Sequence, residues 1–228
     1  MKKESLKNSN IAMKKIYTDL LVLLTIFNVE SSFAADADTI IVTKEYESDI
    51  RSAIEKANAR PDGPNVILFK FRSSLHTIKL SEPLVLTASN TVIDGYDGSN
   101  STAVLDGVDS TFVGIKIDKG ASNVVLKNLT IKNCSDGVFS DANGTLLSNC
   151  KLENNINGVR SYGRIVVDGC SITNNESNGI LFHHPGGYSK SDTLFVKNSV
   201  IASNGGGISV SIPAAEGSII ENNLIYSN

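Results

Sequence analysis

"GVRSYGRIVVDGCSITNNESNGILFHHPGG", residues 158–187, is the stretch that decides the fold of this chain. Glycine and asparagine recur every few positions between short aliphatic segments. A helix does not tolerate so many turn-forming residues, because they favour left-handed or irregular backbone. The pattern therefore indicates short strands joined by tight corners.

The same pattern repeats through the C-terminal half of the chain. Asparagine or glycine occupies one equivalent corner position at intervals of 21, 20, 29 and 24 residues: Asn128, Asn149, Gly169, Asn198 and Asn222. An aliphatic residue follows three positions later in every repeat: Ile131, Leu152, Ile172, Ile201 and Ile225. Asparagine or serine follows after two more: Asn133, Asn154, Asn174, Ser203 and Ser227. A glycine-aliphatic pair closes four of the repeats: Gly137-Val138, Gly158-Val159, Gly179-Ile180 and Gly207-Ile208.

A repeat of this length predicts a solenoid with three short strands in each coil. A single coil cannot bury its own aliphatic face, so each coil needs neighbours above and below it. Stacked coils pair in parallel about 4.8 Å apart. We expect the aliphatic columns to face a shared interior, and the asparagine side chains to form hydrogen bonds along the corners.

Four segments carry a family resemblance: "VVLKNLTIKNCSDGV", "LLSNCKLENNINGV", "VVDGCSITNNESNGI" and "FVKNSVIASNGGGI". They resemble the right-handed parallel β-helix repeat of the pectate-lyase-like superfamily, and the resemblance covers about residues 91–228. The segment "DIRSAIEKANARPDGPNVILF", together with "TVIDG", is similar to the helical cap of secreted bacterial β-helix proteins. The resemblance implies an all-β fold, a right-handed single-stranded parallel β-helix (solenoid) with an N-terminal capping helix. Members of the superfamily include polysaccharide lyases, hydrolases, epimerases, phage tailspikes and adhesins.

The N-terminus has the pattern of a leader for export. Lysine-rich sequence precedes the apolar run Leu20–Val29, and Ser32 and Ala34 suit the small-residue cleavage site of a signal peptide. We therefore expect residues 1–34 to be a signal peptide and the mature chain to be secreted, extracellular or periplasmic. The alternative is an uncleaved membrane anchor, although the run is short for a membrane span. After cleavage we expect no transmembrane segment.

Residues 35–90 are expected to form an N-terminal cap, and residues 91–228 the coils. Residues 39–43 read as a strand. Residues 48–65 read as a helix that begins at the N-cap Ser48 and has an apolar stripe at helical spacing. Strands are expected at 66–71, 77–87 and 91–95. The final "IIENNLIYSN" lies within a coil, so we expect either that the chain is a truncated piece of a longer protein or that another element covers this end.

The sequence contains three cysteines, and it does not decide whether any two of them form a disulfide. Cys150 and Cys170 occupy the same column on consecutive coils, and Leu129 shares that column. We expect a reduced, buried stack; the alternative is a strained disulfide. Cys134 lies in another column.

Composition limits the classes of function. The formal net charge is −3, so the composition gives no sign of nucleic-acid binding. There is no phosphate-binding glycine loop, no Gly-x-Ser-x-Gly and no His-Glu-x-x-His. The function must therefore come from the outer face of the solenoid.

Strand alternation predicts which side chains face outward. With Val138, Val159 and Ile180 pointing inward, the residues beside them point out. The first expected outward row is Lys116, Phe139, Arg160 and Leu181, and the second is Asp118, Asp141, Tyr162 and His183.

These rows suggest chemistry on a polysaccharide or cell-surface glycan. The candidate catalytic residues are Asp118, Asp141, Arg160, Tyr162 and His183. Two carboxylates one coil apart suit a retaining glycosidase, or a calcium ion held by Asp118 and Asp141. Arg160 or Tyr162 could act as the base of a lyase on an acidic polysaccharide. The insertion at 183–193 could form a groove wall, which makes Lys116, His184, Tyr188 and Lys190 candidate substrate-binding residues.

Simpler explanations compete at each position. Outward polar residues can be plain solvated surface, and Arg160 could pair with Asp141 across coils. The sequence establishes no cofactor, and calcium is the one candidate. The alternative function is a non-catalytic, adhesin-like surface β-helix.

Overall fold

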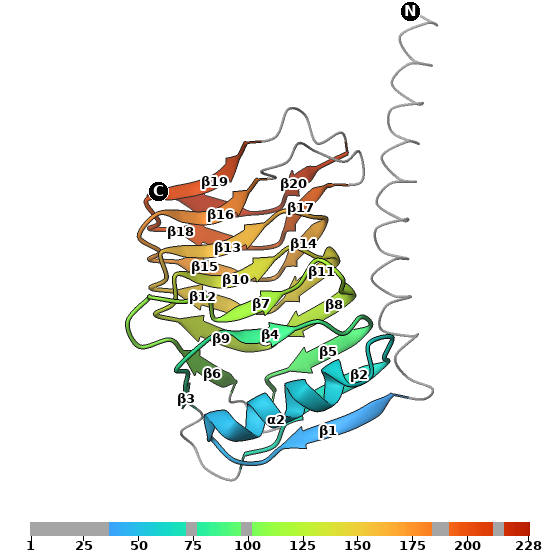
Figure 1. Cartoon of the computed structure of the whole chain (residues 1–228). Coiled ribbons are helices and arrows are strands. Elements are labelled where there is room, and N and C mark those ends of the chain that lie inside the picture. The colour runs from blue at the N-terminus through green and yellow to red at the C-terminus, as the bar shows by residue number, and fades with distance from the viewer. Residues whose placement is uncertain (1–36, 72–76, 97–101, 184–191, 212–216) are drawn as a thin grey trace, which may run out of the picture. The chain divides into compact units, whose positions relative to one another are not determined.

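The computed structural model describes residues 37–71, 77–96, 102–183, 192–211 and 217–228. The expected signal peptide lies outside these residues. From Asp38 onward the chain forms one unit in which short strands wind through three parallel sheets (Figure 1). The prediction of an all-β parallel solenoid with three strands per coil is therefore confirmed.

The three sheets run side by side along the solenoid, and each complete coil contributes one strand to each. Sheet A consists of β1 (Asp38–Val42), β2 (Asn65–Phe69), β5 (Thr91–Asp94), β8 (Ser122–Lys127), β11 (Asn143–Ser148), β14 (Ile165–Asp168), β17 (Leu194–Lys197) and β20 (Ile219–Glu221). Sheet B consists of β3 (Thr77–Lys79), β6 (Ala103–Asp106), β9 (Leu129–Lys132), β12 (Lys151–Glu153), β15 (Ser171–Thr173), β18 (Val200–Ala202) and β21 (Leu224–Tyr226). Sheet C consists of β4 (Leu84–Leu86), β7 (Ile115–Ile117), β10 (Asp136–Ser140), β13 (Asn157–Ser161), β16 (Asn178–Phe182) and β19 (Gly206–Val210).

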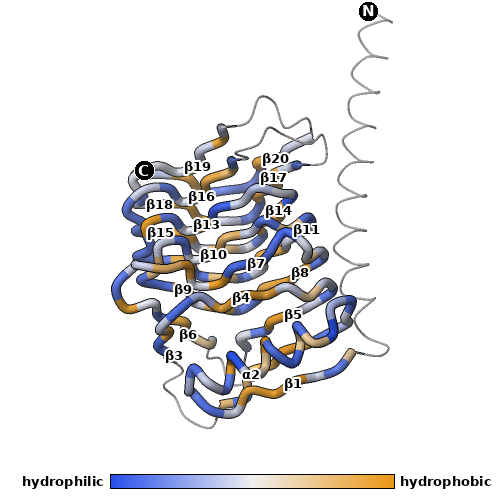
Figure 2. The backbone as a smooth tube through the Cα atoms, viewed as in Figure 1, coloured by the Kyte–Doolittle hydropathy of each residue, from blue (hydrophilic) through white to orange (hydrophobic). Residues whose placement is uncertain are grey.

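The aliphatic columns fill the interior, as the repeat predicts. Ile131, Leu152, Ile172 and Ile201 pair in register through sheet B, and all four are fully buried. In the last coil the equivalent Ile225 is 45% exposed, because no described strand lies beyond β21. Figure 2 shows the apolar segments recurring along successive coils.

The corners have the left-handed backbone that the repeat requires. The residues at both predicted corner columns have φ between +52° and +65°: Asn128, Asn149, Gly169, Asn198, Asn222, Asn133, Asn154, Asn174, Ser203 and Ser227. Asparagine and glycine tolerate this region better than other residues. The repeated asparagines therefore set where the chain turns from one sheet to the next.

A buried asparagine ladder lies one residue beyond the second corner column. Asn175 Oδ1 accepts hydrogen bonds from the backbone N–H (3.0 Å) and the side-chain amide (3.1 Å) of Asn155 in the preceding coil. The side-chain amide of Asn175 donates to Leu152 O and to Asn204 Oδ1. Asn228 continues the ladder in the last coil. Every link satisfies corner backbone groups that burial would otherwise leave unpaired.

Helix α2 (Glu47–Asn58) is the only helix among the described residues. Its buried stripe of Ile50, Ala53, Ile54 and Ala57 confirms the predicted apolar spacing, and the helix contacts β1, β2 and β4. Two details differ from the prediction. The helix ends at Asn58, before Pro61, and its N-cap is Tyr46 with no side-chain cap rather than Ser48.

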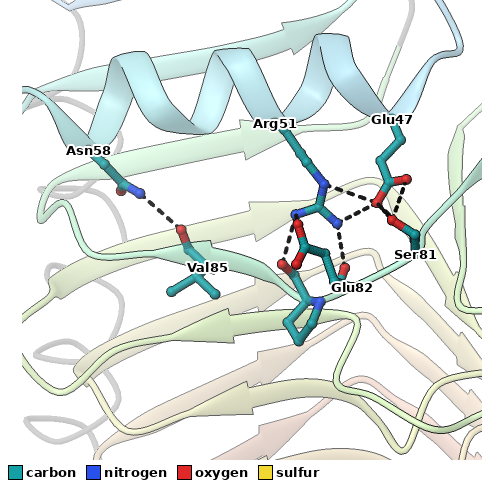
Figure 3. A network of polar contacts seen from close by, with 7 residues as sticks. Glu47, Arg51, Asn58, Ser81, Glu82 and Val85 are labelled. Atoms are coloured by element: carbon teal, nitrogen blue, oxygen red, sulfur yellow. Dashed lines mark hydrogen bonds and ion pairs between the residues drawn. The ribbon is translucent and has the colours of Figure 1, made fainter.

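Polar contacts attach α2 to the turn between β3 and β4 (Figure 3). Arg51 binds Glu47 and donates to the carbonyl oxygens of Glu82 and Pro83, while the Ser81 N–H donates to Glu47 at 2.8 Å. Partial burial would raise the pKa of Glu47, but the hydrogen bonds from Ser81 and Arg51 outweigh it and lower the pKa. This turn, which contains Pro83, also explains why the single strand expected at 77–87 is two strands in different sheets.

The three cysteines are buried and unpaired. Cys150 and Cys170 are stacked on consecutive coils, since Ser171 N–H donates to Cys150 O. The contact with the Cys150 thiol, together with burial, raises the pKa of Cys170, and burial raises the pKa of Cys134 to about 12. The Cys134 and Cys170 thiols are therefore protonated and unreactive at neutral pH.

Candidate functional site

The two predicted outward rows lie together on the outer face of sheet C. In the first row, Lys116 pairs with Phe139, Phe139 with Arg160, and Arg160 with Leu181. We call the eight residues of the two rows the sheet C surface: Lys116, Phe139, Arg160, Leu181, Asp118, Asp141, Tyr162 and His183. All eight are partly exposed.

The second row follows the ends of the same strands. Backbone hydrogen bonds continue the parallel ladder there: Asp141 N–H donates to Ile117 O, Tyr162 N–H to Ser140 O, and His183 N–H to Ser161 O, at 2.9 to 3.0 Å. Asp118, Asp141, Tyr162 and His183 therefore belong to consecutive coils, about 4.8 Å apart. The predicted alternation of inward and outward side chains is correct through four coils.

Three aromatic rings form a continuous contact along this surface. The ring centroids of Phe139 and Tyr162 are 4.9 Å apart, and those of Tyr162 and His183 are 6.1 Å apart. Both pairs are edge-to-face, with interplanar angles of 78° and 75°, which is a favoured aromatic geometry. The rings therefore support one another across three coils and form a semi-rigid apolar row.

Arg160 is fixed between this row and a buried carboxylate. Its guanidinium carbon lies 4.7 Å from the Phe139 ring centroid, within cation–π range. Its Nη2 group forms an ion pair with Asp136, not with Asp141. Its Nε is buried and has no hydrogen-bond partner among the described residues. Arg160 is thus held in place by contacts within the protein.

Asp136 is a residue of this site that the sequence reasoning missed. Its side chain is only 2% exposed, and Asn157 donates a hydrogen bond of 2.9 Å to its Oδ1. Burial raises the pKa of Asp136, and the contacts with Asn157 and Arg160 offset only part of that rise. A signal was present in the sequence: Asp or Asn precedes the glycine in "DGV", "NGV" and "NGI".

The two candidate carboxylates have different surroundings. Asp118 accepts an ion pair from Lys116 at 2.7 Å. Asp141 forms no ion pair with any described residue. A calcium ion would need several oxygens in addition to this pair. Among the described residues, no three His, Cys, Asp or Glu side chains are grouped to hold a metal, so calcium at Asp118 and Asp141 stays a prediction.

His183 lies at the end of the row. Its Nδ1 is 2.6 Å from the Ser211 hydroxyl, so a serine of the next coil orients the imidazole. His184, Tyr188 and Lys190, the predicted groove-wall residues, lie outside the described residues.

No helix in the described part of the chain is both long enough and apolar enough to cross a membrane.

Comparison with protein-family models and with curated proteins finds no match to this chain.

Proposed function

We propose that this chain is a secreted parallel β-helix protein that binds a polysaccharide or cell-surface glycan along the sheet C surface. We further propose that its coils are right-handed, as β-strand crossovers usually are, and that α2 caps the N-terminal end. The pectate-lyase-like resemblance of the repeat supports both points. The single observation that carries the function is the row of Phe139, Tyr162 and His183.

The row matches the chemistry of a sugar chain. A pyranose has apolar C–H faces that pack against aromatic rings, and its hydroxyls need donors and acceptors at the edges. The coil spacing of about 4.8 Å is close to the length of one sugar residue in an extended chain. A glycan lying along the solenoid axis would therefore meet a new ring, or a new polar neighbour, at each sugar.

Rigidity supports the same proposal. The rings contact one another, Arg160 is held by Asp136, and His183 is held by Ser211. Binding then immobilises few free side chains, which lowers the entropic cost of association. A plain solvated surface has no need of this order.

Binding assays with purified protein test the proposal. Phe139→Ala and Tyr162→Ala should each weaken binding to an immobilised polysaccharide by about tenfold, since stacked aromatics are worth roughly 1 kcal/mol or more. Tyr226→Ala is the matched control, because Tyr226 is a 50% exposed aromatic on sheet B. Equal binding by all three variants would remove the sheet C surface as the site.

Glycoside hydrolysis is a second candidate, favoured by the positions of Asp118 and Asp141. Consecutive coils place their backbones about 4.8 Å apart, close to the carboxyl separation of about 5–5.5 Å in retaining enzymes. Asp141, without an ion pair among the described residues, would then be the carboxylate free to react, and Asp118 would have to leave Lys116. If the unaltered chain releases reducing sugar and Asp141→Asn does not, hydrolysis is established. Repeating the assay with added calcium and with a chelator tests whether the metal is required.

A further inference from the structure

We propose that the sheet C surface selects neutral sugar residues over uronic acids. This inference rests on the proposed glycan binding and names its ligand class. It also departs from the acidic substrate expected from the sequence. The argument starts from the charges on the surface.

Both cations of the sheet C surface are already neutralised by protein carboxylates. Lys116 pairs with Asp118 at 2.7 Å, and Arg160 pairs with Asp136. Counting these four groups and Asp141, the described charges comprise two cations and three carboxylates. Together with the buried Asp136 beneath it, the surface therefore carries one more carboxylate than cations, a formal charge of about −1.

The pair beneath the surface cannot easily be exchanged for a ligand carboxylate. Asp136 is 2% exposed, so a uronate that took Arg160 away would leave a buried charge without its partner. Breaking such a pair is strongly unfavourable, because the remaining buried charge has neither water nor a partner. The exposed Lys116 pair is weaker, but its release would expose Asp118 to the same ligand.

Asp141 adds direct repulsion. It lies one coil from Asp118 and one coil from Tyr162, in the middle of the second row. A polyuronate bound along the rings would bring one negative charge per sugar past this carboxylate. A neutral sugar would instead offer hydroxyls, which a carboxylate and a serine-bound imidazole can both hydrogen bond.

Arg160 can still serve a neutral ligand. Its side chain is 33% exposed, and a guanidinium has more N–H donors than the Asp136 contact uses. A sugar hydroxyl can accept from these donors without breaking the ion pair. Arg160 can thus donate hydrogen bonds to a ligand although Asp136 neutralises its positive charge.

The test is a binding competition with the full chain. Neutral polymers (a β-glucan, a mannan and a xylan) are compared with polygalacturonate and alginate, at low and at high ionic strength. We expect at least one neutral polymer to bind about tenfold or more tightly than either polyuronate, because like charges that meet at a contact repel each other. Raising the salt concentration should reduce this difference in affinity, because salt screens the repulsion between the polyuronate and the surface carboxylates.

Asp141→Asn provides a second measurement. Removing this charge should raise the affinity for polygalacturonate relative to the neutral polymer by severalfold. Tighter binding of a polyuronate to the unaltered chain, or a relative affinity that falls in Asp141→Asn, overturns the inference while leaving glycan binding intact. Binding of neither class overturns the proposed function, and this inference with it.

Discussion

The inner and outer faces of sheet C differ although the same strands form both. Inward residues repeat from coil to coil: Val138, Val159 and Ile180 are all aliphatic and fully buried. The outward residues beside them change at every coil, from lysine to phenylalanine to arginine to leucine. Each coil packs against the same kind of neighbour inside, so the interior repeats. Outside, no such packing constrains the residues. The outward positions can therefore differ from coil to coil and determine which ligand the surface binds.

The largest expected effect is on the inner columns. Ile172 is fully buried between Leu152 and Ile201, so Ile172→Ala should lower the free energy of unfolding by about 4 kcal/mol through lost burial and a cavity. Thr173→Ala, the adjacent outward position in β15, should change it by about 0.5 kcal/mol or less. Chemical denaturation measures both, and a loss below about 1 kcal/mol for Ile172→Ala would contradict the assignment of this column to a tightly packed interior.

The second-largest loss of stability is expected in the asparagine ladder. Asn175→Ala removes the acceptor of the Asn155 N–H and the donor to Leu152 O, both buried, which should cost about 3 kcal/mol. Asn174→Gly is the control, because glycine adopts the φ of +57° at that corner as easily as asparagine does. If Asn174→Gly proved as destabilising as Asn175→Ala, the distinction between ladder and corner asparagines would be lost.

The Arg160–Asp136 pair lies between the two faces and should give an intermediate, pH-dependent effect. Arg160→Gln leaves the buried Asp136 without its cation, at a cost of about 2–3 kcal/mol near neutral pH. Burial already raises the folded-state pKa of Asp136 above its unfolded value, and loss of the arginine raises it further. The penalty belongs to the ionised form, so it grows as the pH rises through the folded pKa and disappears once acid protonates the carboxyl.

Thermal unfolding across the acid-to-neutral range measures this. The stability gap between the unaltered chain and Arg160→Gln should shrink as the pH falls. The double variant Asp136→Asn/Arg160→Gln should recover most of the loss at neutral pH, because no buried charge remains. Lys116→Gln, which breaks the exposed pair with Asp118, should cost about 0.5 kcal/mol. A gap that widened in acid would mean that Asp136 is not the group responsible.

Sequence reasoning succeeded wherever a residue repeats. Ile131, Leu152 and Ile172 were placed inside because each recurs in the same column, and Asn128 was placed at a corner for the same reason. It was wrong at Ser48, which was chosen on N-cap preference alone. The N-cap is Tyr46, and the helix that follows packs on β1, β2 and β4. Preference for a cap is a weak local term, and tertiary packing outweighs it.

By itself, the sequence determined the coil, its three strands, its buried columns and the two rows that face outward, because these follow from a period that every repeat shares. Only the tertiary structure decided that Arg160 binds Asp136, that Lys116 holds Asp118, and that Phe139, Tyr162 and His183 touch. Those contacts depend on rotamers and on diagonal neighbours between coils, and no repeat specifies them because each occurs once. The periodic sequence determines the path of the backbone. The interactions of the charged and aromatic surface residues depend on which side chains lie beside them.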